Sequence, residues 1–144
     1  MANECIGTIG PWGAGYSGDS WTFELNGSKL TEIWIASGDY IDSLRFIYKD
    51  QNGDTHQSPK YGGNGGILRK IKFLKDEEEE LIEIGGTTGK YVNSLYFHTN
   101  KWTFGPYGRV KGTHFSLPVA KGKFVGFFGY SGAYIDRIGA ILEF

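Results

Sequence analysis

The chain has 144 residues, with 15 Lys and Arg against 16 Asp and Glu and a formal net charge of −1. That length fits one domain with a sizeable core, and the balanced charge gives no overall field that favours nucleic acid or an anionic membrane. The one cysteine, Cys5, cannot form an internal disulfide, and the N-terminus lacks the basic and apolar regions of a signal peptide. We therefore expect a cytoplasmic or nucleocytoplasmic protein that does not insert into membranes.

The composition and the residue pattern predict an all-β fold. Aromatic residues make up 16% of the chain and glycine supplies 23 residues, as in β proteins with many tight turns. Alternation and runs of β-branched or aromatic residues predict strands at residues 21–25, 30–36, 41–49, 67–74, 80–85, 92–99, 101–104, 114–117, 124–130 and 135–144. No segment combines a helical period with caps.

Two groups of polar residues invite a metal-binding or catalytic interpretation that their spacing does not support. The acidic run at 76–80 would point to alternate sides of an extended chain, so we expect a solvated hairpin tip. His56, His98 and His114 lie far apart, without the spacing of metal ligands. Nucleophilic catalysis would need a base and an orienting group beside a Ser or Cys. We therefore predict no enzymatic activity, no metal and no other cofactor.

One short pattern occurs three times and divides the chain into repeats. It reads Gly-x-Tyr, then Ile or Val, then Asp or Asn, and it starts at Gly38, Gly89 and Gly132. The intervals are 51 residues (38 to 89) and 43 residues (89 to 132), as expected when one supersecondary unit is repeated. We call these segments the turns. They predict repeat units of roughly 1–50, 51–100 and 101–144 within a single domain, 1–144.

A second threefold element is a loop that opens with an aromatic residue and a glycine. These loops read WGAGYSG at 12–18, YGGNGG at 61–66 and YGRVKG at 107–112. Pseudo-threefold symmetry in a closed β structure brings each loop beside one turn. We define pair 1 as turn 132–136 with loop 12–18, pair 2 as turn 38–42 with loop 61–66, and pair 3 as turn 89–93 with loop 107–112.

Pairs 1 and 2 have the chemistry of a site for a neutral polyol. Their glycine-rich loops expose backbone N–H groups without a Cβ in the way, and each turn supplies one carboxylate, Asp136 or Asp42. A phosphate site would use cations or a helix N-terminus, and a metal site would use several carboxylates or histidines. Sugar hydroxyls can donate to the carboxylate in the stronger, charge-assisted class of hydrogen bond.

Pair 3 departs from this chemistry in both of its parts. Asn93 replaces the carboxylate, and Arg109, Val110 and Lys111 stand where glycines would expose the backbone. An amide has one acceptor oxygen fewer than a carboxylate and no charge. We therefore expect a structural role for pair 3.

These residues resemble the jacalin-related lectins over nearly the full length of the chain. The matching segments are 10–18, 37–46, 61–66, 104–118 and 125–140. The last of them reads VGFFGYSGAYIDRIGA. The resemblance implies a β-prism I of three four-stranded antiparallel sheets with internal pseudo-threefold symmetry. It also implies no enzymatic activity, no metal, a plant source, and binding of the monosaccharide ends of glycans. Prism lectins often pair through their terminal strands, so a homodimer is one expectation.

The same resemblance implies the sugar class. Galactose-specific members are cut near the N-terminus, and the new amine joins the site. This sequence runs continuously from Met1 through the loop at 12–18. The resemblance is therefore to the mannose/glucose-specific branch, and the expected partners are mannose- or glucose-containing glycans.

Carried over residue by residue, the resemblance implies a first carbohydrate site in pair 1. Site 1 comprises Gly18, Ala133, Tyr134 and Asp136. Asp136 would accept from two sugar hydroxyls, the backbone N–H groups of Ala133 and Tyr134 would donate, and the Tyr134 ring can face the sugar or pack at the strand start. The loop is one residue longer than is usual in the family, so its donor is either Gly18, which we prefer, or Gly15.

A second site is implied in pair 2. Site 2 comprises Asp39, Tyr40, Asp42 and Gly66, in roles equivalent to those of site 1. The alternative is a non-catalytic structural or protein-interaction β domain without sugar binding. In that alternative the Asp side chains only cap their own turns.

Overall fold

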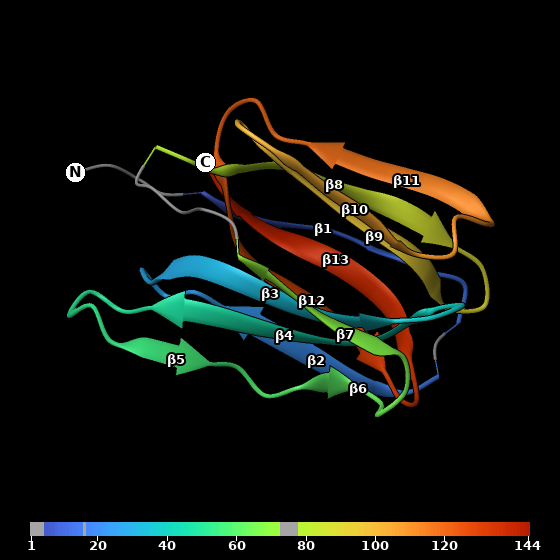
Figure 1. Ribbon diagram of the computed structural model, residues 1–144. Coiled ribbons are helices and arrows are strands. Elements are labelled where there is room, and N and C mark those ends of the chain that lie inside the picture. The colour runs from blue at the N-terminus through green and yellow to red at the C-terminus, as the bar shows by residue number, and fades with distance from the viewer. Residues whose placement is uncertain (1–4, 16, 73–77) are drawn as a thin grey trace.

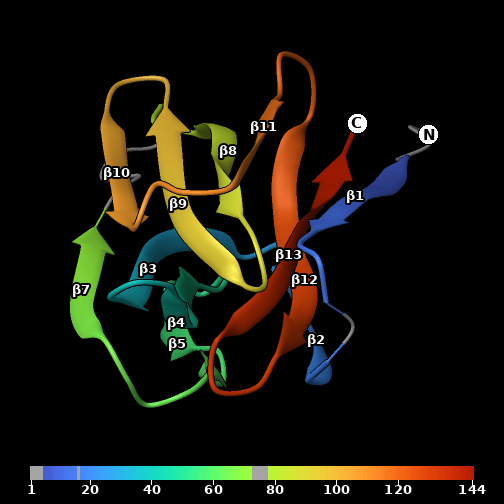
Figure 2. The same cartoon turned by 90° about the vertical axis from the view of Figure 1, so that its right-hand side faces the viewer.

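A computed structural model describes residues 5–15, 17–72 and 78–144. Within these ranges the chain forms β-strands and no helix. Three antiparallel sheets surround a common interior (Figures 1 and 2). The first sheet has the order β1 (Ile6–Trp12), β13 (Ile135–Glu143), β12 (Lys123–Ser131), β2 (Asp19–Glu24). The second has the order β10 (Thr103–Gly108), β9 (Val92–Thr99), β8 (Leu81–Thr88), β11 (Thr113–Pro118). The third has the order β5 (Thr55–Gln57), β4 (Ile41–Lys49), β3 (Lys29–Ser37), β7 (Ile67–Lys72).

The expected prism of three sheets is confirmed, with one refinement in the third sheet. There a further short strand, β6 (Tyr61–Gly62), also pairs with β4. The strands β5 and β6 thus share one edge position of the sheet, separated by residues 58–60. Four strand positions are therefore filled by five strands, and the threefold plan is kept.

Alternation along the strands builds one shared core. Inward-facing aromatic rings stack across the sheets, with 4.7 Å between the centroids of Phe23 and Phe46 and 5.0 Å between those of Phe46 and Phe127. The second sheet adds Ile84, Leu95 and others that are fully buried. Because every sheet contributes to the same core, burial of these side chains fixes the three repeats relative to one another.

Two edge strands differ from the sequence prediction for the same reason. The strand β1 was not predicted, and β10 continues past Phe104 to Gly108. Each contains a Gly-Pro dipeptide, which reads as a turn. In the structure the pairing resumes beyond a register shift, between Ile9 and Trp12 in β1 and between Phe104 and Tyr107 in β10. The dipeptide therefore sits in a bulge and does not end the strand.

The acidic run at 76–80 behaves differently from a solvated tip in its described part. Residues 73–77, which include the end of the predicted strand 67–74, lie outside the described residues. Glu79 is only 2% exposed, and its carboxylate accepts a hydrogen bond of 2.6 Å from the Thr99 hydroxyl. The expectation of a solvated side chain is therefore wrong for Glu79.

The three turns lie together at one end of the prism. Each central hairpin, β3–β4, β8–β9 and β12–β13, has its tip at the right-hand end in Figure 1, and Figure 2 looks onto that end. The connections at the opposite end include the loop between β11 and β12. The fold thus gathers all the predicted site residues on one end surface.

Candidate functional site

The three turns share one backbone hydrogen bond, so the repeat extends to atomic detail. The first glycine N–H of each turn donates to the tyrosine carbonyl two residues on, at 3.0 Å in turn 38–42 and 2.9 Å in turns 89–93 and 132–136. A register shift of the hairpin accompanies each turn. This closed backbone sets the position of the fifth residue, which is Asp42, Asn93 or Asp136.

In pair 1 the carboxylate of Asp136 lies against Gly18. A Cβ atom on Gly18 would come within 2.6 Å of both Asp136 Oδ2 and the Ser131 carbonyl, and the residue has a φ of +90°. Only glycine fits such a position. Gly15 faces Ser17 and the Lys90 carbonyl, at 3.6 and 3.8 Å from its Cβ position. The structure therefore places Gly18, and not Gly15, beside Asp136.

In pair 2 the carboxylate of Asp42 lies against two glycines. Cβ atoms on Gly65 and Gly66 would approach Asp42 Oδ2 to 2.7 Å and Oδ1 to 2.6 Å. The Gly63 N–H also donates to the Asp42 carbonyl at 2.9 Å, which ties the loop to the turn. The pairing inferred from symmetry is thus the one observed, and Gly65 is a neighbour of the carboxylate that the sequence interpretation had not named.

Both carboxylates are nearly buried yet have open acceptor oxygens. Asp42 is 6% exposed and Asp136 is 4% exposed, and none of the hydrogen bonds found among the described residues goes to either carboxylate. Burial raises the pKa of Asp136 above its usual value. Burial also raises the pKa of Asp42, with a smaller contribution from the negative charge of Asp39. Groups of this kind gain from a ligand that brings hydroxyl donors.

The remaining predicted residues surround these carboxylates from the turns. Ala133 and Asp39 are exposed, and Tyr134 and Tyr40 are half-buried. Tyr134 packs its ring against Tyr40 and against Tyr91 of the third turn, with centroid distances of 4.9 and 4.6 Å. Tyr40 and Tyr91 complete the cluster at 4.9 Å. The packing role considered for Tyr134 is therefore present, shared by the tyrosines of all three turns.

Sites 1 and 2 are also joined through the backbone. A Cβ atom on Gly63, in the loop of site 2, would lie 2.2 Å from the carbonyl oxygen of Ala133 in site 1. Sequence reasoning missed this contact because it paired each loop with one turn only. The two sites thus belong to one continuous, rigid surface.

In pair 3 the amide of Asn93 bonds to the loop. Its Nδ2 donates to the Lys111 carbonyl at 2.7 Å, and the Arg109 N–H donates to the Asn93 carbonyl at 2.9 Å. Asn93 is 7% exposed, and its Oδ1 has no hydrogen-bond partner in the described part of the chain. These bonds from Asn93 to the loop agree with the structural role expected for pair 3.

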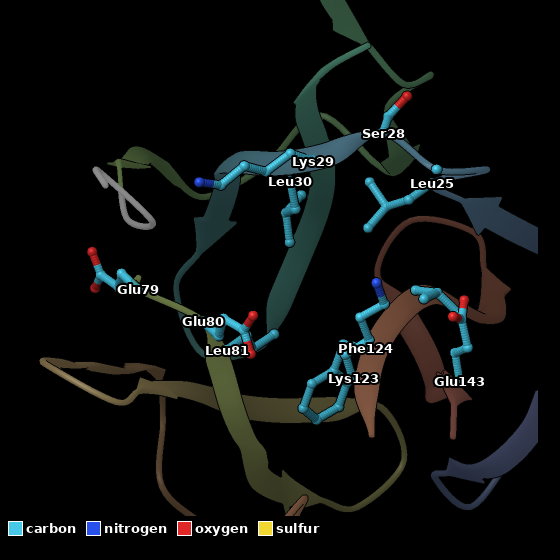
Figure 3. Close-up of a pocket in the computed structure, with 12 residues that line it drawn as sticks. Leu25, Ser28, Lys29, Leu30, Glu79, Glu80, Leu81, Lys123, Phe124 and Glu143 are labelled. Carbon is cyan, nitrogen blue, oxygen red and sulfur yellow. The ribbon is translucent and has the colours of Figure 1, made fainter. Parts of the chain in front are cut away.

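A further hollow lies at the end of the prism away from the turns. It has a volume of about 430 Å³ and is lined by Leu25, Leu30, Leu81 and Phe124 with charged side chains around them (Figure 3). We assign it no function.

The part of the chain that the structure describes holds neither a cluster of metal ligands nor a membrane-spanning helix. Among the described residues, no three His, Cys, Asp or Glu side chains gather where they could hold a metal ion. The same part of the chain contains no helix that is long and apolar enough to cross a membrane.

Comparison with known proteins places this arrangement in a family. Residues 9–141 match the jacalin-like lectin domain. Jacalin-related lectin 3 of Arabidopsis thaliana is 40% identical over 140 residues, which cover 92% of this chain and 23% of that protein. A mannose/glucose-specific lectin of Parkia pendula is 39% identical over 148 residues, which cover 94% of this chain and 32% of that protein. The chain thus spans less than half the length of these two relatives.

A solved structure gives the same assignment at the level of the fold. AcmJRL, a mannose-binding jacalin-related lectin from Ananas comosus, superposes with a TM-score of 0.85 at 39% identity, covering 95% of this chain and 96% of that one. A match this complete in sequence and in structure leaves one assignment: the chain belongs to the jacalin-like lectin family.

Proposed function

We propose that this chain binds mannose- or glucose-type glycans at two sites, without catalysis and without a metal. Site 1 comprises Gly18, Ala133, Tyr134 and Asp136, and site 2 comprises Asp39, Tyr40, Asp42 and Gly66. The observation that carries the proposal is the state of the two Asp side chains. Each is nearly buried against a glycine backbone, and no hydrogen bond from the described residues reaches its oxygens.

This observation favours sugar binding over the structural alternative. If Asp42 and Asp136 only capped their turns, their oxygens would accept hydrogen bonds from the turn backbone. The turns are instead closed by the backbone bond from glycine to tyrosine. A carboxylate that is mostly removed from water, with no donor among the described residues, is unfavourable on its own. Vicinal hydroxyls of a pyranose would supply such donors. The names of the Ananas and Parkia relatives point to mannose and glucose as the sugars.

The direct test is isothermal titration with methyl α-mannoside, with methyl α-galactoside as the control sugar. We expect saturable binding of the mannoside and much weaker binding of the galactoside, because the axial O4 of galactose directs its hydroxyl away from the partners of an equatorial one. Equal affinities would refute the sugar class, and no binding of either would favour the structural alternative.

Binding is expected to survive excess EDTA. Pair 1 offers one carboxylate and pair 2 offers two, whereas a calcium-dependent lectin surrounds the ion with six to eight oxygen ligands. The measurement is the mannoside affinity before and after chelation, with a calcium-dependent lectin treated in parallel. Loss of binding that calcium restores would contradict the proposed site.

Acidification is expected to weaken mannoside binding at a higher pH than an ordinary Asp would. The ionised carboxylate is the acceptor, and burial raises the pKa of Asp42 and Asp136 above 3.8. The mannoside affinity is therefore highest near neutral pH, where both carboxylates are ionised, and it falls as the pH drops through the raised pKa. A raised pKa favours the protonated folded state, so these two groups do not destabilise the fold over the same range. Thermal melts would separate the two effects.

The contribution of Asp39 gives this pH dependence a site-specific check. Because the charge of Asp39 adds to the rise in the pKa of Asp42, Asp39→Asn should move the acid limb of site 2 to lower pH. The profile of site 1 should stay in place. Each site can be followed alone in a background that carries Asp136→Asn or Asp42→Asn, and equal shifts at both sites would contradict the assignment.

A further inference from the structure

Pair 3 carries a charge opposite to that of the other two pairs. In pairs 1 and 2 every charged side chain of the turns and loops is a carboxylate. These are Asp136 in pair 1, and Asp39 and Asp42 in pair 2. The turn and loop of pair 3 contain three cations, Lys90, Arg109 and Lys111, and no carboxylate. Since the chain as a whole has a net charge of −1, this is a local concentration of positive charge and not part of a generally basic protein.

Hydrogen bonds hold the backbone that carries these cations. Asn93 Nδ2 donates to the Lys111 carbonyl at 2.7 Å, and the Lys111 N–H donates to the Thr87 hydroxyl at 3.3 Å. The Arg109 N–H is bonded to the Asn93 carbonyl at 2.9 Å. The amide that removes the carboxylate from the turn is thus the group that fixes the loop. Asn93 therefore brings no negative charge to the turn, and it holds the loop that carries Arg109 and Lys111.

The three cations of pair 3 are not neutralised by a carboxylate among the described residues. Lys90, Arg109 and Lys111 are exposed, and the ion pairs found among the described residues involve none of them. The Lys90 ammonium lies 5.6 Å from the ring centroid of Tyr91. Like charges on neighbouring segments repel one another, so a bound anion would relieve the repulsion and receive charge-assisted hydrogen bonds.

A hollow beside the third turn offers room for a ligand. It has a volume of about 410 Å³ and lies next to the three cations, which do not line it themselves. One side is formed by Thr88 at the end of β8, Gly89, Thr113, His114 and Phe115, and the other by residues 11–14 and Arg137. Hydroxyl, imidazole and backbone groups of this kind suit a hydroxylated ring. The Tyr91 ring also packs on Tyr134 of site 1 and Tyr40 of site 2, so the three pairs form one surface.

We propose that pair 3 binds the anionic group of an acidic saccharide, a sulfate ester or a carboxylate, through Lys90, Arg109 and Lys111. The arginine suits bidentate binding of a planar or tetrahedral oxyanion, and the lysines act as point charges. A glycan that has a neutral mannose end and an acidic residue could then occupy pair 3 together with site 1 or site 2, which raises the overall affinity without any new contact.

The test compares a triple variant with a charge-matched control. The variant Lys90→Gln/Arg109→Gln/Lys111→Gln removes the three cations of pair 3. The control Lys49→Gln/Lys121→Gln/Lys123→Gln removes three exposed cations from strand ends and a loop at the opposite end of the prism. The probes are dextran sulfate for sulfate esters, polygalacturonate for carboxylates, neutral dextran, and a short DNA duplex. Binding is measured from 50 to 300 mM salt, with methyl α-mannoside titrated in parallel.

We expect wild type and control to bind at least one of the two acidic saccharides, with an affinity that falls as salt rises. The pair 3 variant should lose about tenfold or more in affinity and most of the salt dependence, while its mannoside affinity stays within about twofold of wild type. Which polymer binds identifies the anionic group.

Three outcomes would overturn the proposal. The first is no binding of either acidic saccharide by the wild type. The second is an equal loss in variant and control, which would mean diffuse attraction. The third is binding of the DNA duplex as tight as that of the saccharides, with the same dependence on Lys90, Arg109 and Lys111. None of these depends on the mannoside result, so a failure of pair 3 and a failure of the neutral sites are distinguishable.

Discussion

Asp136→Asn is expected to lower the mannoside affinity of site 1 by roughly ten- to a hundredfold while leaving the protein folded. The substitution exchanges a charged acceptor for a neutral amide, whose NH₂ group faces the donors of the sugar. The loss corresponds to about 1.5–3 kcal/mol, the usual worth of a hydrogen bond to a charged group. Titration in an Asp42→Asn background isolates site 1, and unchanged affinity there would remove Asp136 from the site.

The stability of the Asp136→Asn variant makes this result hard to confuse with unfolding. Burial raises the pKa of Asp136, which means that its ionised form is disfavoured in the folded protein. Replacement by a neutral side chain of the same shape should therefore keep or raise the melting temperature. A variant that binds weakly because it is partly unfolded would melt earlier than wild type and would lose site 2 as well.

The sequence predicted the architecture well because its strongest signals were periodic. Glycine is needed where the loop backbone closely approaches the turn, as at Gly18, Gly66 and Gly112, and this requirement recurs in each repeat. The phase of the repeats was enough to pair each turn with its loop. The strand β1, the end of β10 and the short strands β5 and β6 were not predicted, because Gly-Pro and Ser-Pro interrupt the alternation there.

Contacts between repeats were beyond the reach of the sequence. The approach of Gly63 to Ala133 and the cluster of Tyr40, Tyr91 and Tyr134 depend on how the three sheets close. The burial of Glu79 likewise depends on Thr99, 20 residues away. Each copy of a motif looks alike in sequence, and only the closed prism shows which copies touch.

For pair 3 the sequence predicted only the absence of a sugar site, and the structure adds what Asn93 does there. The loss of a carboxylate and the basic loop were both visible in the sequence, and they predicted that pair 3 would not serve as a third neutral site. The bond from Asn93 to Lys111 connects the two changes. Asn93 lacks the carboxylate that a neutral-sugar site needs. The same residue also holds the loop that carries Arg109 and Lys111, which we propose to bind an acidic saccharide.

Valency should separate the three copies most sharply. Asp42 and Asp136 are open carboxylates against glycine loops, whereas the Asn93 amide is engaged by its own loop. We therefore expect a calorimetric stoichiometry of two methyl α-mannosides per chain for wild type, one for Asp42→Asn and one for Asp136→Asn, with the lost site about ten- to a hundredfold weaker.

The third copy supplies the control for this experiment. Asn93→Ser should still bind two sugars, since its side chain serves the loop and no neutral sugar. A wild-type value of one that Asp42→Asn leaves unchanged would reduce site 2 to a structural turn. A value of three that falls to two with Asn93→Ser would show that an amide suffices as the acceptor. If the wild type binds two sugars, its two sites lie on one body, in contact through Gly63 and Ala133. We then expect branched glycans to bind well above the monosaccharide affinity, because the second contact is intramolecular.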